Sequence, residues 1–249
     1  MMANKVTLPD LSARRPPSDS EYVYQELKQS CMIGEFEPGQ KLTLPLLAEA
    51  FGTSQMPVRE ATNRLIAARA MEAPPRRSIS IPEATVDRLE SLLPLRLLLE
   101  GEATQRATER SDADLADRLQ ALNTELDALA EQDDIKAYLR TNQSFHFTVY
   151  RACGSDDLID LIELLWMRYG PLMNIVRSSV LSETGHLNHA HVIEAIRQRD
   201  GIAAASAIRA DISDAAKPIH AAILRNQHIL AAQTQSGRQR SKKTASNVA

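Results

Sequence analysis

Residues 41–81 constrain the fold more than any other part of the 249-residue chain. Apolar residues in the first half of this stretch recur at helical spacing, and Gly52 follows where a residue without Cβ can take the left-handed conformation that ends a helix. Thr53 or Ser54 can then cap the free amides of a second helix. The stretch therefore predicts two helices joined by a tight turn.

The second of these helices has one apolar side and one polar side. The residues that recur at three and four positions, and are expected to face a core, are Val58, Ala61, Leu65 and Ile66. The opposite side is predicted to carry Gln55, Arg59, Thr62 and Asn63. Side chains of these types can reach base edges and phosphates when a helix lies in the major groove of DNA. An amphipathic helical hairpin with no nucleic-acid role is the alternative.

A basic turn and a strand are predicted directly after this helix. The sequence PPRRS at 74–78 is typical of a turn, and the residues from Ile79 onward alternate as in a strand. Residues 41–42 are expected to pair with the wing strands as the third member of a small sheet. Arg76 and Arg77 place positive charge beside the helix, which suits a phosphate or minor-groove contact.

Residues 23–81 resemble the winged helix-turn-helix domain of the GntR superfamily of bacterial transcription regulators. The resemblance rests on the turn GEFEPGQKL and the run PVREATNRL. It implies that the DNA-contacting residues are Ser54, Gln55, Met56, Arg59 and Asn63 of the helix-turn-helix, together with Arg76 and Arg77 of the wing.

The chain departs from the usual family pattern at three of these positions. Gln55 stands where an arginine usually contacts guanine, Met56 where threonine is usual, and Ser78 where the wing usually has glycine. Because glutamine pairs with the adenine edge and arginine with the guanine edge, we expect an operator altered at the base pair read by residue 55.

The composition predicts a mostly helical chain of two domains. Hydrophobic residues make up 43% of the chain but aromatic residues only 4%, which favours helices packed by aliphatic side chains. The sequence lacks an apolar run of membrane-spanning length and an apolar leader, so a cytoplasmic protein is predicted. Cys31 and Cys153 have no metal-binding spacing and are expected to be buried apolar residues.

Helix-breaking residues and changes in the apolar pattern divide the chain into four parts. These are a disordered arm (1–18), a winged helix-turn-helix domain (19–82), an all-helical effector-binding and dimerisation domain (83–231) and a disordered basic tail (232–249). Helices are expected at 20–33, 85–109, 113–131, 135–153, 156–179, 183–199 and 202–230, and from 85 onward they predict an antiparallel bundle of six to seven helices. Pro94 and Pro218 should kink two of these helices or mark their true starts.

The formal charge is distributed unevenly among these parts. Residues 1–82 carry +1, residues 83–230 carry −8 and residues 231–249 carry +4. Because the acidic middle segment would be repelled by DNA, contact with DNA is expected from the two ends of the chain. The arm and the tail are each open to two interpretations, an additional phosphate contact or an inert disordered terminus.

Four polar residues of the predicted bundle could converge. Asn142 and His146 are four residues apart on one helix face, His189 lies on a later helix, and Asp211 follows 22 residues after it on the next, antiparallel helix. Together they offer two nitrogen and two oxygen ligands to a divalent ion. His191 is about 200° around the helix from His189 and should point elsewhere. Solvent-exposed or hydrogen-bonded core histidines are the alternative.

Residues 87–215 resemble the FCD ligand-binding domain of the FadR subfamily, through LRLLLEGEA, NQSFH and HAHVIEAIRQRD. The resemblance implies a metal held by Asn142, His146 and His189, with Asp211 standing where the last histidine usually is. Zinc, nickel or manganese are the expected ions. With one oxygen donor in place of nitrogen, weaker zinc or nickel binding and more tolerance of manganese or magnesium are expected, and a metal-free cavity is the alternative.

Arg96 matches the arginine that commonly faces the cavity of this family. A buried guanidinium is suited to clamping a carboxylate, so the resemblance implies a small organic-acid or sugar-acid effector. The alternative is an ion pair with Glu100, four residues further on.

These expectations combine into a metabolite-responsive, DNA-binding transcription regulator, a repressor of a catabolic operon that acts as a homodimer on a pseudo-palindromic operator. A metal-dependent hydrolase with an accessory DNA-binding domain is the alternative from another class. It would need an open coordination position and a general base, and the sequence has no HExxH motif. A purely architectural DNA-binding dimer is a third interpretation.

Overall fold

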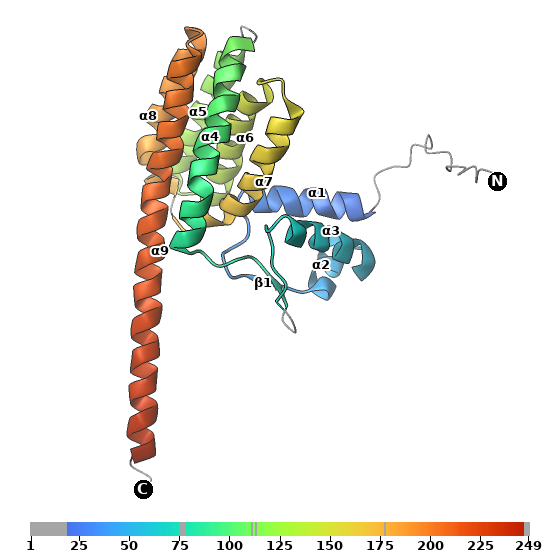
Figure 1. The fold of residues 1–249 in the computed structure, drawn as a ribbon, viewed down its shortest axis with the longest axis vertical. Helices are drawn as coiled ribbons and strands as arrows, with labels where there is room; N and C mark the ends of the chain where they lie inside the picture. Colours follow the sequence, from blue (N-terminus) through green and yellow to red (C-terminus); the bar gives the residue numbers. More distant parts are fainter. Residues whose placement is uncertain (1–18, 75–77, 111, 113, 177, 247–249) are drawn as a thin grey trace, which may run out of the picture.

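The computed structural model describes residues 19–74, 78–110, 112, 114–176 and 178–246. A small N-terminal unit lies beside one end of an elongated helical bundle (Figure 1). The N-terminal elements are α1 (Asp19–Met32), β1 (Lys41–Leu42), α2 (Leu44–Phe51), α3 (Gln55–Ala67) and β2 (Ile79–Ser80). The bundle contains α4 (Val86–Arg110), α5 (Leu115–Glu131), α6 (Ile135–Arg151), α7 (Asp156–Met173), α8 (Ser178–Arg197) and α9 (Gly201–Ser246). The predicted winged helix-turn-helix followed by an all-helical bundle is confirmed.

The turn between α2 and α3 forms as its residue types require. The Thr43 hydroxyl accepts a hydrogen bond from the Leu46 amide and caps the start of α2. Gly52 ends that helix with φ +61°, in the left-handed region. Of the two candidate caps for α3, Ser54 occupies the cap position but its side chain makes no capping hydrogen bond to a described residue, and the Thr53 hydroxyl donates to Asp19 instead.

The wing is smaller than predicted. Strands β1 and β2 pair antiparallel, with Lys41 opposite Ser80 and Leu42 opposite Ile79. A single bridge between Glu72 and Ser80, closed by two backbone hydrogen bonds of 2.9 Å, stands in place of a full third strand. Pro74, which has no amide hydrogen, prevents the ladder from continuing beyond this bridge.

The bundle follows the predicted helix order, with a shift at one junction. Helix α7 ends at Met173 and α8 begins at Ser178, both earlier than predicted. Gly185 lies within α8, and a Cβ there would be 3.4 Å from the Tyr138 hydroxyl oxygen. Pro94 and Pro218 lie inside α4 and α9.

Helix α9 continues far beyond the end of the bundle (Figure 1). It has 46 residues and reaches Ser246, so the segment predicted to be a disordered tail is helical over most of its length. Alanine, glutamine, lysine and arginine favour helix, and extending an existing helix avoids the cost of nucleation. The predicted arm at 1–18 and the last three residues lie outside the described part of the chain.

The apolar core runs through both units. Trp166, Tyr150 and Tyr169 are the largest fully buried side chains among the described residues of the bundle. Cys31 and Cys153 are free and buried, as predicted. Among the described residues, no helix is long and apolar enough to cross a membrane.

Candidate DNA-binding surface and buried ligand site

The first two turns of α3 present an exposed polar row. The predicted contact residues Ser54, Gln55, Met56, Arg59 and Asn63 are all exposed. The opposite side of α3 is fully buried through Val58, Ala61 and Leu65. Burial of one side therefore fixes which side chains a DNA groove would meet.

Thr62 was wrongly predicted to belong to this row. Its side chain is buried, and its hydroxyl donates to the carbonyl oxygens of Val58 and Arg59 at 2.8 and 3.1 Å. A threonine can hide its hydroxyl against the preceding helical turn, which a classification of residues as polar or apolar misses.

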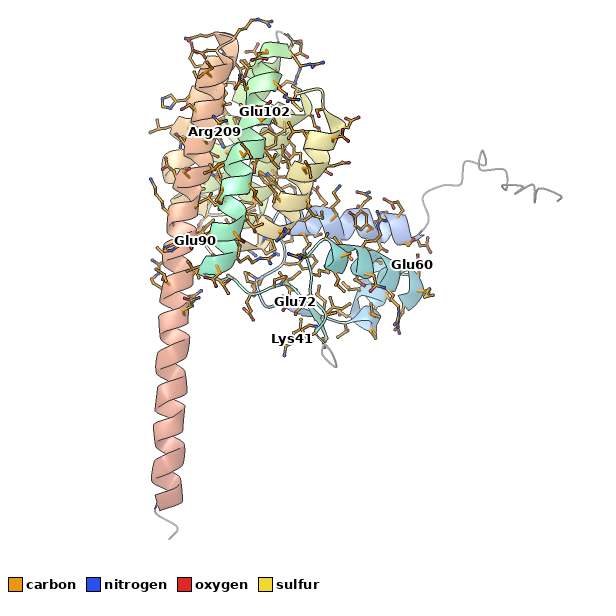
Figure 2. The ribbon with its side chains drawn as sticks, viewed as in Figure 1. Lys41, Glu60, Glu72, Glu90, Glu102 and Arg209 are labelled. Carbon is orange, nitrogen blue, oxygen red and sulfur yellow. The ribbon has the colours of Figure 1, made fainter. Side chains whose placement is uncertain are left out.

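The wing lies next to this surface. Lys41 and Glu72 are on the wing side of the N-terminal unit, and Glu60 is on the outer side of α3 (Figure 2). Arg76 and Arg77, the predicted wing contacts, lie outside the described residues.

Three of the predicted metal ligands converge inside the bundle. His146 on α6, His189 on α8 and Asp211 on α9 each place a ligand atom within 4.8 Å of the others. The distance from His146 Nε2 to Asp211 Oδ2 is 3.3 Å, and that from His189 Nε2 to Asp211 Oδ1 is 3.5 Å. All three side chains are buried. His191 is exposed, as expected from its position on the helix.

The tautomer of His146 follows from its neighbours. The Tyr150 hydroxyl donates its single proton to Glu100 Oε2 at 2.6 Å, so it can only accept from His146 Nδ1, 2.9 Å away. Nδ1 of His146 therefore carries the hydrogen. In the neutral imidazole, Nε2 is left with a lone pair that points at the carboxylate of Asp211.

His189 is fixed in the same way by a residue from a different helix. Its Nδ1 lies 3.2 Å from Oδ1 of Asn123 on α5, and an amide oxygen can only accept. Its Nε2 is buried and has no hydrogen-bond partner among the described residues. A buried, unsatisfied nitrogen that faces a carboxylate calls for a cation between them.

Protons are poor candidates for that cation. Burial is the main cause that lowers the pKa of His146, and it outweighs the opposing effect of Asp211. Near neutral pH His146 is therefore a neutral imidazole beside the carboxylate of Asp211.

A divalent metal fits this donor set. Two ligand atoms that are each about 2.1 Å from a tetrahedral ion lie about 3.4 Å apart, close to both nitrogen-to-oxygen separations. Second hydrogen bonds at Nδ1, of the kind that Tyr150 and Asn123 provide, are typical of metal-binding histidines.

Asn142 lies beside these three ligands. It is half-buried and lines a cavity of about 30 Å³ together with Arg96, Tyr138, His146 and Asp211. The cavity has room for about one or two water molecules. Three of the four predicted ligands, Asn142, His146 and Asp211, thus border one space, into which Arg96 also faces, while His189 lies against Asp211 outside this lining.

Arg96 forms the ion pair that we had considered as the alternative. Its Nε and Nη2 lie 2.6 and 3.0 Å from the two carboxylate oxygens of Glu100, and both side chains are buried. Its guanidinium lies over the rings of Tyr169 and Trp166, at 4.1 and 4.8 Å from their centroids. Although burial alone would lower the pKa of Arg96, Glu100 raises it, so the group stays charged.

Several residues of this network were not identified from the sequence. Glu100 Oε2 also accepts from the indole of Trp166 at 3.0 Å, so it joins Arg96 to the hydroxyl of Tyr150. Tyr150 could have been found, because it stands four residues after His146 on the same helix. No sequence signal marked Asn123, since its partner lies on a distant helix.

The fold and the two sites define a class of protein, one that joins a DNA-reading module to a buried ligand site. Family models match both parts: the description "Bacterial regulatory proteins, gntR family" matches residues 19–81, and "FCD domain" matches residues 90–214. The chain belongs to the GntR family of bacterial transcription regulators and carries an FCD domain of the FadR-like type.

Curated relatives agree with this assignment. The HTH-type transcriptional regulator McbR of Escherichia coli (strain K12) is 32% identical over 184 residues, which cover 72% of this chain and 82% of McbR. The HTH-type transcriptional repressor GlaR of the same organism is 26% identical over 201 residues, which cover 75% of this chain and 89% of GlaR.

Solved structures share the fold. E. coli McbR/YncC superposes with a TM-score of 0.71 at 27% identity, covering 87% of this chain and 99% of that one. A GntR transcriptional regulator from Rhodococcus sp. RHA1 gives a TM-score of 0.67 at 19% identity, covering 81% and 97%.

These findings decide between the classes of function. The chain is a DNA-binding transcription regulator, and its relatives are regulators and not enzymes, so the hydrolase alternative is wrong. FCD domains bind metals in some members and imply a small-molecule effector.

Proposed function

We propose that this regulator is a homodimeric repressor of a catabolic operon, released from its operator by a small carboxylate. Residues 19–82 form the DNA-reading domain of this proposal, and residues 83–231 bind the effector and dimerise. GlaR is named a transcriptional repressor, which supports repression as the mode of regulation proposed for this chain.

The observation that carries the effector site is the pair of bare imidazole nitrogens that face Asp211. His146, His189 and Asp211, with Asn142 beside them, are proposed to hold zinc, nickel or manganese. A bound divalent ion would supply the positive charge that attracts a carboxylate to this cavity. Arg96 is proposed to contribute the second positive group of the effector site, with its orientation set by Glu100.

The size of the cavity indicates how an effector could act. About 30 Å³ is too small for an organic acid, so effector binding requires the surrounding helices to move. A ligand that binds better to the rearranged bundle shifts the population toward it. Such a shift would change the distance between the two recognition helices of the dimer on the operator.

Dimerisation is proposed on the face formed by α4 and α9, which are adjacent along much of the bundle (Figure 1). Leu95 and Leu98 on α4 are 46% and 62% exposed, and Leu224 on α9 is 38% exposed. Glu102, one turn after Leu98 on α4, lies on the visible side of this face (Figure 2). Neighbouring exposed leucines on packed helices favour burial against a second copy.

Arg59→Ala tests the DNA-reading surface. The probe is a duplex selected by the wild-type protein from a random library. Loss of one base or phosphate contact in each protomer should weaken duplex binding by more than about 30-fold. Dimer mass and metal content should be unchanged, because Arg59 is exposed and remote from the bundle.

Arg118→Ala is the matched control, since Arg118 is an exposed arginine on α5 that pairs with Asp112. It should leave duplex affinity unchanged. Unaltered affinity of the Arg59→Ala protein would overturn the assignment of α3 as the recognition helix.

A further inference from the structure

Helix α1 joins the reading module, which is the N-terminal DNA-binding unit at 19–81, to the bundle. Its residues pack on α3, which carries the polar row, and also on α7 of the bundle (Figure 1). The contact with α7 is close at Gly170, where a Cβ would lie 2.1 Å from the Cys31 carbonyl oxygen and 2.6 Å from that of Met32. Because only glycine allows this approach, α1 and α7 are held in one register.

Polar contacts from the same helix reach both α7 and α6. Lys28 forms an ion pair with Glu163 on α7. Gln29 and Gln143 exchange two amide hydrogen bonds, with Gln29 Nε2 donating at 3.0 Å and Gln143 Nε2 donating at 3.3 Å. This reciprocal amide pair is a direct polar link between α1 and α6, and Arg140 of α6 also pairs with Glu35, just after α1, at 2.7 Å.

Gln143 stands one helical turn before His146. Its side chain is 6% exposed, and it follows Asn142, which lines the ligand cavity. The same turn of α6 therefore faces the ligand site on one side and α1 on the other. If His146 moves when the site fills, the rigid helix carries Gln143 with it.

A second contact keeps the two units docked without this pair. Nη2 of Arg88, on α4, donates to the carbonyl oxygen of Arg168 at 3.0 Å and lies 3.4 Å from that of Arg69, just after α3. Together with the Lys28–Glu163 pair, it should hold the reading module in place when Gln143 is truncated.

We propose that Gln143 is a positioning residue that couples occupancy of the His146–His189–Asp211 site to the orientation of the recognition helix, through its amide pair with Gln29. The inference rests on the proposed function, since it requires a ligand site that regulates DNA binding. It adds the residue pair through which the regulation passes.

The test compares duplex affinity with and without Zn²⁺ as the only added ligand, on the full-length dimer and its selected duplex. In the wild type, Zn²⁺ is expected to change the dissociation constant for the duplex by at least about fivefold, the lower end of typical coupling between sites. In Gln143→Ala the ratio of the two dissociation constants, measured without and with Zn²⁺, should fall to within about twofold of one. Zn²⁺ affinity and metal-free duplex affinity should stay within about threefold of wild type.

Two further variants separate coupling from simple loss of a contact. Gln120→Ala, a truncation of an exposed glutamine on α5, should keep the wild-type ratio. The double variant Gln29→Lys/Gln143→Glu replaces the amide pair by an ion pair and should restore most of the ratio.

A metal-free readout complements these measurements. Hydrogen exchange in α1 should become faster in Gln143→Ala and not in Gln120→Ala, because the variant removes an anchor of α1. The proposal would be overturned if hydrogen exchange in α1 were equally fast in Gln143→Ala and Gln120→Ala. It would also be overturned if Zn²⁺ changed the duplex dissociation constant of Gln143→Ala as much as that of the wild type.

Failure of the underlying function is recognisable separately. A wild-type protein that selects no duplex contradicts the proposed function itself. A wild-type protein that binds its duplex equally with and without Zn²⁺ leaves the DNA-binding function standing and overturns the coupling.

Discussion

The ligand site depends on two hydrogen bonds at the residue scale. Tyr150 and Asn123 each occupy Nδ1 of a histidine, so both Nε2 atoms are turned toward Asp211, and in the neutral imidazoles both carry a lone pair. The arrangement concentrates electron-rich atoms in a buried space and is stable only when a cation, or a rearrangement, relieves it.

Replacing both histidines tests the metal site. His146→Ala/His189→Ala should reduce bound divalent metal from about one ion per chain to a negligible amount, measured by elemental analysis of protein purified without chelators. The wild type should also gain thermal stability when Zn²⁺ is added, and the double variant should not. His186→Ala/His191→Ala, which removes two exposed histidines of α8, is the control. Equal, negligible metal in wild type and double variant would contradict the site.

The lowered pKa of His146 predicts how acid affects the metal-free protein. Between pH 7.5 and 5.5 the unfolded chain binds a proton at this residue, while the folded protein resists it because burial lowers the pKa. Proton binding then favours unfolding, by at most about 1.4 kcal/mol for each pH unit below the unfolded value.

The melting temperature of chelator-treated wild type should therefore fall by a few degrees over this range. The loss should be smaller in His146→Gln, which cannot bind the proton. Parallel decreases in the two proteins would show that His146 stays protonated in the fold.

Gln55 predicts a specific change in the DNA sequence that is read. It is exposed in the first turn of α3, where an amide side chain pairs with adenine. Gln55→Arg should change the preferred base at one position of each half-site from adenine to guanine, as measured by selection from a random library. The same selected sequence for both proteins would show that residue 55 does not reach a base.

At the element scale, close packing of α1 on α7 gives the reading module its position. The sequence predicted both helices but gave no sign that they touch, because a glycine in a helix has several possible reasons. The distances at Gly170 supply the reason here, since two carbonyl oxygens occupy the place of a side chain.

Gly170→Ala should force α1 away from α7. The added methyl group would overlap backbone atoms that cannot rotate aside, which is expected to cost about 1 to 3 kcal/mol of unfolding free energy in urea titrations. Gly185→Ala on α8 is the matched control, because its nearest neighbour is 3.4 Å away and alanine favours helix. A Gly170→Ala protein as stable as wild type would mean that the helices can separate freely.

The same scale shows which predictions from residue patterns were wrong. Most helix ends were placed to within a few residues, since apolar spacing and caps are local, but α9 continues to Ser246, well past its predicted end at 230. The α7–α8 junction was misplaced, since α7 ends at Met173 and α8 begins at Ser178, both earlier than predicted. Thr62 was misassigned because hydrogen bonding to its own helix allowed burial.

At the scale of the whole molecule, the acidic bundle and the reading module differ in how their charge interacts with DNA. The bundle repels DNA and leaves the exposed row of α3 to approach it. The proposed dimer would present two such rows to one operator, with the exposed leucines of α4 in its interface.

Leu98→Glu should interrupt that surface. A charge at the centre of an apolar contact is expected to shift the protein from dimer to monomer at micromolar concentration, as measured by light scattering after gel filtration. Operator affinity should fall with it, because two linked reading heads bind more tightly than one. Leu187→Glu changes a leucine of similar exposure on α8 and should stay dimeric. A dimeric Leu98→Glu protein would place the interface elsewhere.

The sequence by itself determined the two-part architecture and the polar row on α3, and it singled out Asn142, His146, His189 and Asp211 as candidate ligands. These features follow from periodicity, turn chemistry and family motifs, which are all read along the chain. Only the tertiary structure decided that Arg96 is held by Glu100, that both imidazoles turn bare nitrogens toward Asp211, and that Gln143 meets Gln29. Those contacts join residues from different helices, and their geometry depends on how the helices pack against each other.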